Sequence, residues 1–206
     1  MDYITMTKEE AIKMLNDCCE NEITIKICQN NKRQTLLKNI PLGTVINGGK
    51  YIVVEHFENG TTGIVKKEAI KPNIQFGDTN EWNKSDLRKY LNTQYLNKIT
   101  SEFGEIELHT VDMLSMDGDD SYGKCEDIVS AMTFDRWRKY YKYIGNVNYT
   151  EWLSTPSQTE NSNDSRCVQV VYSDGCVNYR DCSWSDCSVR PFFILKSSIT
   201  VSLDKA

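Results

Sequence analysis

The stretch Val189-Arg190-Pro191-Phe192-Phe193-Ile194-Leu195 decides the fold of this chain, because four consecutive apolar residues follow a proline and a single charged residue. A short, continuous apolar run is typical of a fully buried strand. Arg190 is held between Val189 and Pro191, where its guanidinium can make buried charge-assisted hydrogen bonds to carbonyl groups or to a carboxylate. We therefore predict that residues 192–195 form the last, closing strand of the core and that Arg190 anchors it.

The sequence before this strand predicts further short strands. Asp174-Gly175 is a turn signal between the apolar stretches 168–172 and 177–179, which indicates a hairpin. Trp152 and Leu153 place large apolar side chains near the end of a strand, where Pro156 forbids further pairing. Beyond Tyr149 there are no helix signals. We expect a loop-rich C-terminal third built on antiparallel strands.

A strand meander and two helices are predicted upstream. Asn-Gly pairs supply the positive φ angles of hairpin turns, so strands are expected over 44–46, 51–55 and 62–65, with turns at 47–49 and 59–60. An apolar stripe of Leu87, Tyr90, Leu91 and Tyr95 predicts a helix that ends near Ile99. Thr133 is the predicted N-cap of another helix, with Phe134, Trp137 and Tyr141 on one face. The fold class is therefore α+β.

Residues 1–35 are predicted to form an N-terminal helix–strand appendage to a main domain over 36–206. Thr7-Lys8-Glu9-Glu10 is a capping-box pattern that starts an amphipathic helix over about 8–20. Ile23, Ile25 and Ile27 alternate with polar residues, as in a half-buried strand. The polar stretch over 29–34 is the predicted linker.

Composition limits the classes of function. The chain has 206 residues, 39% of them hydrophobic and 26% charged, as in a globular protein with a sizeable core. A net charge of −5 argues against nucleic acid as a direct ligand. No apolar stretch has the length of a secretory signal or of a membrane span. We expect a cytoplasmic protein without a membrane partner, whose eight cysteines are reduced and are small buried or half-buried hydrophobic residues.

Patterns that resemble known ligand sites are incomplete. The segment 43–50 lacks the Gly-Lys-Ser/Thr ending of a phosphate-binding loop and reads as a hairpin turn. Asp117-Gly118-Asp119-Asp120-Ser121 lacks the offsets of an EF-hand, so we expect a solvated turn, with an adventitious cation site as the alternative. His56 and His109 are too few for a histidine metal cluster. We predict no catalytic residue, no metal and no cofactor.

Cys182 and Cys187 are the remaining chemical candidate. Two thiolates on one loop could hold copper(I) or form a redox pair. On a regular strand, positions five apart point to opposite faces, so this pairing requires a bend.

Four segments in this order resemble a known family: Trp82-Asn83-Lys84-Ser85-Asp86-Leu87-Arg88-Lys89-Tyr90-Leu91-Asn92, Glu151-Trp152-Leu153-Ser154-Thr155-Pro156, Ser173-Asp174-Gly175-Cys176-Val177-Asn178-Tyr179 and Val189-Arg190-Pro191-Phe192. Across residues 41–203 the chain resembles a bacterial and prophage domain family of unknown function. That family is similar in its C-terminal pattern to the formylglycine-generating-enzyme branch of the C-type lectin fold, which includes variable receptor-binding proteins diversified by retroelements. The resemblance implies a C-type-lectin-like fold with short antiparallel strands and two or three helices.

Side chains suited to binding lie between these segments. Tyr, Ser, Asn and Trp on loops of a rigid frame are typical of a paratope, because they give contact area at low entropy cost. The predicted ligand-binding residues are Tyr172, Asn178, Tyr179, Arg180, Trp184 and Asp186. The alternative is that they are the polar surface of a turn-rich fold.

We therefore expect a non-catalytic binding module with a protein partner. The resemblance implies a phage- or mobile-element protein in the host cytoplasm, where inhibition of a host defence would fit. One alternative is a copper-dependent oxidase related to formylglycine-generating enzymes, although Cys182 and Cys187 lie closer to Val189 than the cysteine pair does in those enzymes. Another is a sugar-binding lectin, although the Glu-Pro-Asn or Gln-Pro-Asp motif is absent. The oligomeric state is left open.

Overall fold

The computed structural model describes residues 9–10, 12–13, 33–162 and 165–203. By its internal contacts the chain divides into two units, Met1–Asn30 and Asn31–Ala206. In the first unit, the described residues 9–10 and 12–13 are helical, within the helix predicted over 8–20. The strand predicted over residues 23–28 lies outside the described residues.

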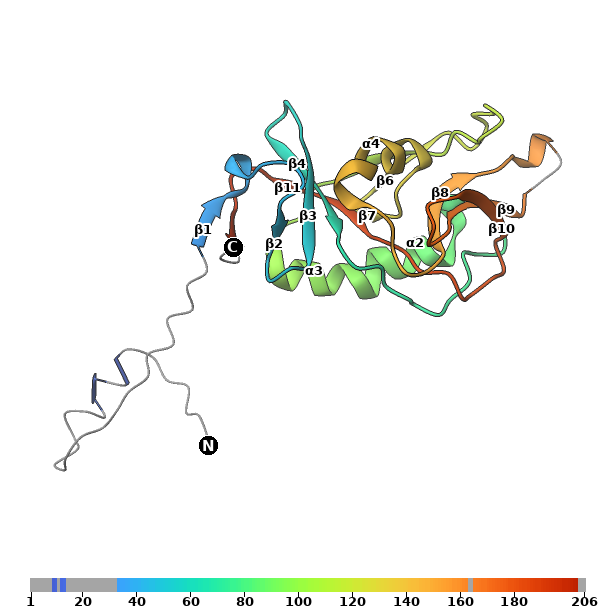
Figure 1. Cartoon of the computed structure of the whole chain (residues 1–206). Helices are drawn as coiled ribbons and strands as arrows, with labels where there is room; N and C mark the ends of the chain where they lie inside the picture. Colours follow the sequence, from blue (N-terminus) through green and yellow to red (C-terminus); the bar gives the residue numbers. More distant parts are fainter. Residues whose placement is uncertain (1–8, 11, 14–32, 163–164, 204–206) are drawn as a thin grey trace. The chain divides into compact units, whose positions relative to one another are not determined.

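The second unit has a mixed α+β structure in which the paired strands run mostly antiparallel (Figure 1). Its strands are β1 (Arg33–Leu36), β2 (Val45–Ile46), β3 (Tyr51–His56), β4 (Thr61–Lys66), β5 (His109–Asp112), β6 (Lys124–Asp127), β7 (Val129–Ser130), β8 (Glu151–Pro156), β9 (Cys167–Val171), β10 (Val177–Asp181), β11 (Phe192–Lys196) and β12 (Thr200–Leu203). Its helices are α2 (Asp86–Tyr90), α3 (Leu96–Phe103) and α4 (Phe134–Ile144). A π-helical turn, η3 (Leu91–Tyr95), joins α2 to α3, and 3-10 turns lie at η1 (Leu37–Asn39), η2 (Trp82–Lys84) and η4 (Glu160–Ser162).

The main sheet has five strands in the order β2-β3-β4-β11-β7. The predicted meander is confirmed as β2, β3 and β4, and the predicted hairpin at Asp174-Gly175 is confirmed as β9 and β10. A second sheet has the order β10-β9-β8, while β1 pairs with β12 and β5 with β6. The chain therefore places β10 at the outer edge of the second sheet.

The apolar run after Pro191 forms β11, which lies inside the main sheet between β4 and β7. The prediction that it is the last strand is wrong. The chain turns after Lys196, and β12 returns to pair with β1. The signal for β12 is the alternation Thr200-Val201-Ser202-Leu203, which is much weaker than the apolar run before it. The linker prediction over 29–34 is also wrong at its end, because Arg33 and Gln34 belong to β1.

Both faces of the main sheet are buried, and alternate residues of one strand enter different clusters. In β11, Phe193 and Leu195 join one apolar cluster, whereas Phe192 and Ile194 join the other. The first cluster includes Leu91 and Ile99 from the α2–α3 segment, and the second includes residues of α4. Figure 1 shows α3 and α4 on different sides of these strands. This two-sided burial explains why β11 reads as a continuous apolar run instead of an alternating one.

The helices begin where the sequence predicts. Ser85 Oγ accepts a hydrogen bond from Arg88 N at the start of α2, and the helical segment continues past the predicted end at Ile99 to Phe103. In α4, the N-cap at Thr133 is confirmed. The buried face of α4 consists of Trp137, Tyr140 and Ile144. The assignment of Tyr141 to that face is wrong, because its side chain is 40% exposed.

We expect Thr133→Ala to lower the free energy of unfolding by about 1 kcal/mol, the usual effect of losing an N-cap side chain. Thr133 is buried, and its Oγ1 accepts a hydrogen bond from Arg136 N at 3.2 Å. Urea denaturation followed by circular dichroism measures the change. Thr133→Ser is the matched control, because it keeps the hydroxyl group. Equal losses in the two variants would show that the hydroxyl does not cap α4.

Candidate binding surface

The base of the candidate surface is a buried ion pair between Arg190 and Glu151. Arg190 Nε lies 3.1 and 2.9 Å from the two carboxylate oxygens of Glu151, and Arg190 NH2 lies 2.8 Å from Oε2. Arg190 NH1 donates to the Ile144 carbonyl oxygen at 2.9 Å, at the end of α4. Both side chains are fully buried, and burial raises the pKa of the Glu151 carboxyl while Arg190 opposes that rise. The predicted anchoring role of Arg190 is confirmed.

Backbone hydrogen bonds hold the segment before Arg190 in place on two sides. Ile70 and Val189 exchange hydrogen bonds of 2.9 Å in both directions. On the other side, Trp152 N donates to Ser188 O at 2.8 Å, and Ser188 N donates to Thr150 O at 2.7 Å. These hydrogen bonds therefore fix the C-terminal end of the loop over residues 182–187.

The β9–β10 hairpin leads to this loop. Its tip is a turn in which Gly175 has a φ of 88°, and Asp174 Oδ1 accepts a hydrogen bond from Cys176 N at 2.9 Å. A positive φ suits glycine because it has no Cβ. The edge strand, β10, carries Val177 and Tyr179, whose side chains are 36% and 56% exposed.

Three of the predicted binding residues form one cluster, which we call the Arg180 cluster: Tyr172, Arg180 and Trp184. The guanidinium carbon of Arg180 lies 5.0 Å from the ring centroid of Tyr172 and 4.8 Å from that of Trp184. The strand register brings Tyr172 and Arg180 to the same side of the sheet, since Arg180 pairs with Val168 and side chains alternate along a strand. Trp184 is 45% exposed and lies in the turn after β10, where its backbone N–H donates a hydrogen bond to the Asp181 carbonyl oxygen at 3.1 Å.

Asp181 follows Arg180 in β10, so its side chain lies on the opposite side of the sheet, where it binds Arg166. Arg166 Nε and NH2 each lie 2.8 Å from a different oxygen of the Asp181 carboxylate. Asp181 Oδ1 also accepts hydrogen bonds from the N–H and the hydroxyl of Ser183. These contacts, first that of Arg166, hold the pKa of Asp181 well below its usual range. Asp181 therefore fixes the turn that positions Trp184.

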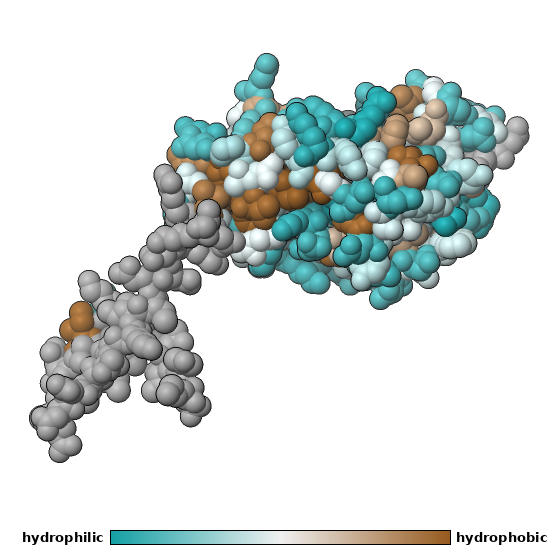
Figure 2. Space-filling model, viewed as in Figure 1, coloured by the Kyte–Doolittle hydropathy of each residue, from teal (hydrophilic) through white to brown (hydrophobic). Residues whose placement is uncertain are grey.

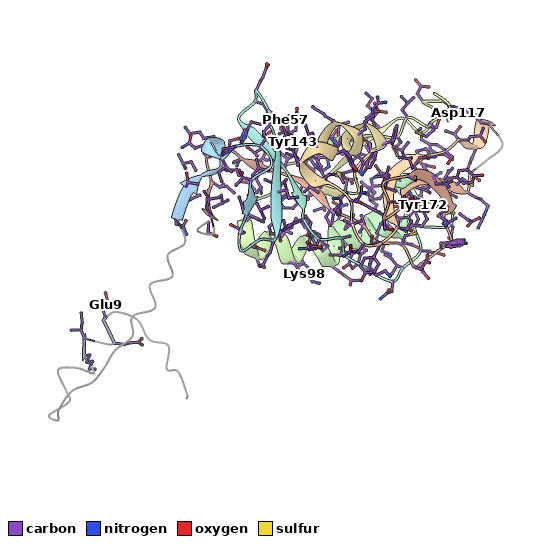
Figure 3. The ribbon with its side chains drawn as sticks, in the orientation of Figure 1. Glu9, Phe57, Lys98, Asp117, Tyr143 and Tyr172 are labelled. Atoms are coloured by element: carbon purple, nitrogen blue, oxygen red, sulfur yellow. The ribbon has the colours of Figure 1, made fainter. Side chains whose placement is uncertain are left out.

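The other three predicted residues lie outside the Arg180 cluster. Tyr179 pairs with Gln169 and so points to the opposite side of the sheet from Arg180. Asn178 is exposed, and its Oδ1 accepts a hydrogen bond from Tyr179 N at 2.8 Å. Asp186 is exposed and lies beside the thiol of Cys187. In Figure 3, the labelled Tyr172 lies at the end of the second unit where β9 and β10 are found, away from Phe57 and Tyr143.

Another cation–aromatic contact, between Lys71 and Tyr149, was not predicted from the sequence. Lys71 Nζ lies 4.3 Å from the ring centroid of Tyr149, whose side chain is 49% exposed. The bridge between Ile70 and Val189, and the hydrogen bonds between Ser188 and Thr150, bring this pair to the same segment as the Arg180 cluster. No local signal could have found it, because Lys71 and Tyr149 stand far apart in the chain and belong to no motif.

Comparisons with protein-family models, curated proteins and solved structures found no match for this chain. In the described part of the chain, no helix is both long and apolar enough to cross a membrane.

Cys182 and Cys187 are buried in the larger apolar cluster and are not bonded to each other. Burial raises the pKa of both thiols, that of Cys187 to about 12. This opposes the thiolate form that copper(I) binding or disulfide exchange requires. The described residues also contain no group of three or more His, Cys, Asp or Glu side chains that could hold a metal ion.

The remaining sequence patterns have structural roles. Positive φ angles at Asn47, Gly48 and Gly49 form the predicted hairpin turn between β2 and β3. In the acidic loop, Asp119 Oδ2 accepts a hydrogen bond from Thr159 Oγ1 at 2.8 Å, and hydrogen bonds lower the pKa of Asp119. His56 lies 2.8 Å from both Thr62 Oγ1 and Ile40 O. His109 is buried and lies 2.9 Å from Ser130 Oγ.

Proposed function

We propose that this protein is a non-catalytic binding module that contacts a protein partner through the Arg180 cluster and the exposed residues around it. The observation that carries the proposal is the position of Arg180 over the rings of Tyr172 and Trp184 on the protein surface. Tyr, Trp and Arg are the residue types that most often dominate the energy of protein interfaces. Here they are held in one arrangement before any partner arrives, which reduces the entropy cost of binding.

The rest of the surface supports binding better than catalysis. Two surface pockets, of about 300 and 280 Å³, are lined by other residues and include no member of the Arg180 cluster. Enzyme sites usually combine an enclosed pocket with convergent polar groups of shifted pKa. The face in Figure 2 is mostly polar, and its apolar side chains form separate patches. Aromatic and arginine residues are enriched in protein interfaces, and the rim around them is polar.

We further propose that the fold is C-type-lectin-like, of the formylglycine-generating-enzyme branch, and that the protein acts in the cytoplasm of a bacterial host. The order of the four sequence segments supports both proposals. The same resemblance supports a phage or mobile-element origin, for which inhibition of a host defence is a fitting role.

Affinity capture from a bacterial host lysate, followed by mass spectrometry, tests the binding function. We expect one partner to be retained by the wild type and bound about 30-fold more weakly by Trp184→Ala, which corresponds to 2 kcal/mol for a hot-spot residue. Binding of the purified partner is then measured by calorimetry.

Tyr141→Ala is the matched control for this experiment. Tyr141 is a similarly exposed aromatic residue, but it lies on α4 beside Trp137 and not in the Arg180 cluster. This variant is expected to keep wild-type affinity. A partner that binds wild type and Trp184→Ala equally well would contradict the proposed surface.

A further inference from the structure

Arg180 differs from Arg190, Arg166 and Arg88 in how its charge is compensated. Arg190 and Arg166 each bind a carboxylate, as does Arg88, whose Nε lies 2.6 Å from Asp127 Oδ1. The Arg180 guanidinium lies over two aromatic rings, and within the described residues it makes no ion pair and donates no side-chain hydrogen bond. Stacking uses the face of a guanidinium and leaves the N–H groups at its edge available.

Lys71 adds a second positive charge of the same kind. It is exposed and lies over the Tyr149 ring, and it forms no ion pair with any carboxylate of the described part of the chain. Arg180 and Lys71 both lie close enough to Cys187 to lower the pKa of its thiol, against the larger effect of burial. Both cations therefore lie close to the segment that contains Cys187.

We propose that the partner contacts this surface with an acidic polypeptide segment, and that one of its carboxylates binds the free edge of the Arg180 guanidinium. This inference rests on the proposed binding function. A carboxylate accepts two parallel hydrogen bonds from a guanidinium, which gives both strength and orientation. The rings of Tyr172 and Trp184 keep the guanidinium in place for this contact and reduce the entropy lost on binding.

A polypeptide fits this surface better than a nucleic acid. Nucleic-acid sites neutralise many phosphates with several cations, whereas Arg180 and Lys71 are two cations on a protein of net charge −5. In addition, β10 is the outer strand of its sheet, and Tyr179 N is bonded to the Asn178 side chain instead of to a neighbouring strand. An extended peptide can add to such an edge while its side chains reach the adjacent surface.

Peptide binding to the full-length protein tests the inference. The probe is a synthetic peptide of alternating valine and glutamate, compared with versions that carry glutamine or lysine instead of glutamate and with a single-stranded oligothymidine. Trp184 reports binding, because the other three tryptophans, Trp82, Trp137 and Trp152, are buried. We expect a change in Trp184 fluorescence and an affinity for the glutamate peptide about tenfold above that for the glutamine peptide, because glutamine keeps only one of the two acceptor oxygens.

Arg180→Gln should remove this preference, and Arg180→Glu should favour the lysine peptide. Arg138→Gln is the matched control, because Arg138 also lies over an aromatic ring, Phe134, but is paired with Asp135. Its preference should equal that of the wild type. Equal affinity for the glutamate and glutamine peptides, or tighter binding of oligothymidine, would overturn the inference. A captured partner that still depends on Trp184 would then leave the proposed binding function standing.

Discussion

Arg190→Met is expected to lower the free energy of unfolding by about 3–5 kcal/mol, the usual cost of removing one partner from a buried ion pair. Arg190 and Glu151 are both fully buried, and three nitrogen–oxygen distances between them lie at or below 3.1 Å. Methionine fills much of the same volume, but it leaves Glu151 without its counter-charge and the Ile144 carbonyl oxygen without its donor. Urea denaturation of the wild type and the variant measures the loss.

A double variant separates the ion pair from the space that it fills. Arg190→Met combined with Glu151→Leu removes both charges, so we expect it to lose less stability than the two single variants added together. Additive losses would show that the two charges do not interact. If Arg190→Met does not fold, Glu151→Gln tests the same pair from the other side, since it keeps the shape of the side chain and removes its charge.

The same residue shows how far the sequence predicts this fold. The flanking Val189 and Pro191 and the apolar run after them predicted a buried anchor and a core strand, and both are confirmed. The partner Glu151 could not be assigned, because it stands 39 positions earlier. A charged residue at the start of a strand also reads as exposed, unless its counter-charge is known to lie on a neighbouring segment.

The candidate surface was predicted in part. The residue types of the loop indicated Tyr172, Arg180 and Trp184, but only the register of β9 and β10 brings Arg180 to the same side as Tyr172. Tyr179 was chosen on the same grounds, and strand alternation directs it to the other side. Local patterns state which residue types are present, whereas the pairing of distant strands decides which of them meet.

Arg190 and Arg180 stand ten positions apart and have different roles: Arg190 belongs to the scaffold and Arg180 to the binding surface. Arg190 is buried and its charge is neutralised within the protein, so it stabilises the base on which the loop stands. Arg180 lies at the surface with its charge uncompensated among the described residues, so its hydrogen bonds remain for a partner. Loss of one member of a buried ion pair destabilises a fold, whereas a stacked, unpaired arginine favours recognition.

Acidification is expected to destabilise the protein through His109. Its imidazole is 5% exposed, and burial, followed by the nearby charge of Arg136, lowers its pKa from 6.5 to about 3. In the unfolded chain the same group titrates near its ordinary pKa, so between these two values the unfolded state binds a proton that the folded state does not. Stability from this group is complete above about pH 6.5 and is lost progressively as the pH falls toward 3. Lowering the pH from 7 to 4.5 should cost about 3 kcal/mol, because each pKa unit is worth roughly 1.4 kcal/mol.

The variant His109→Gln isolates this contribution, because glutamine keeps a polar group near Ser130 and does not titrate. His109 Nε2 lies 2.9 Å from Ser130 Oγ, and its ring lies at a right angle to that of Phe192, with centroids 5.1 Å apart. Carboxylates also titrate between pH 7 and 4.5, but they do so in both proteins, so they cancel in the difference. We therefore expect the unfolding free energy of the wild type to fall by about 3 kcal/mol more than that of the variant over this range. Parallel pH profiles would mean that His109 takes up its proton without unfolding, through an opening of the contact between β5 and α4 that lets water reach the ring.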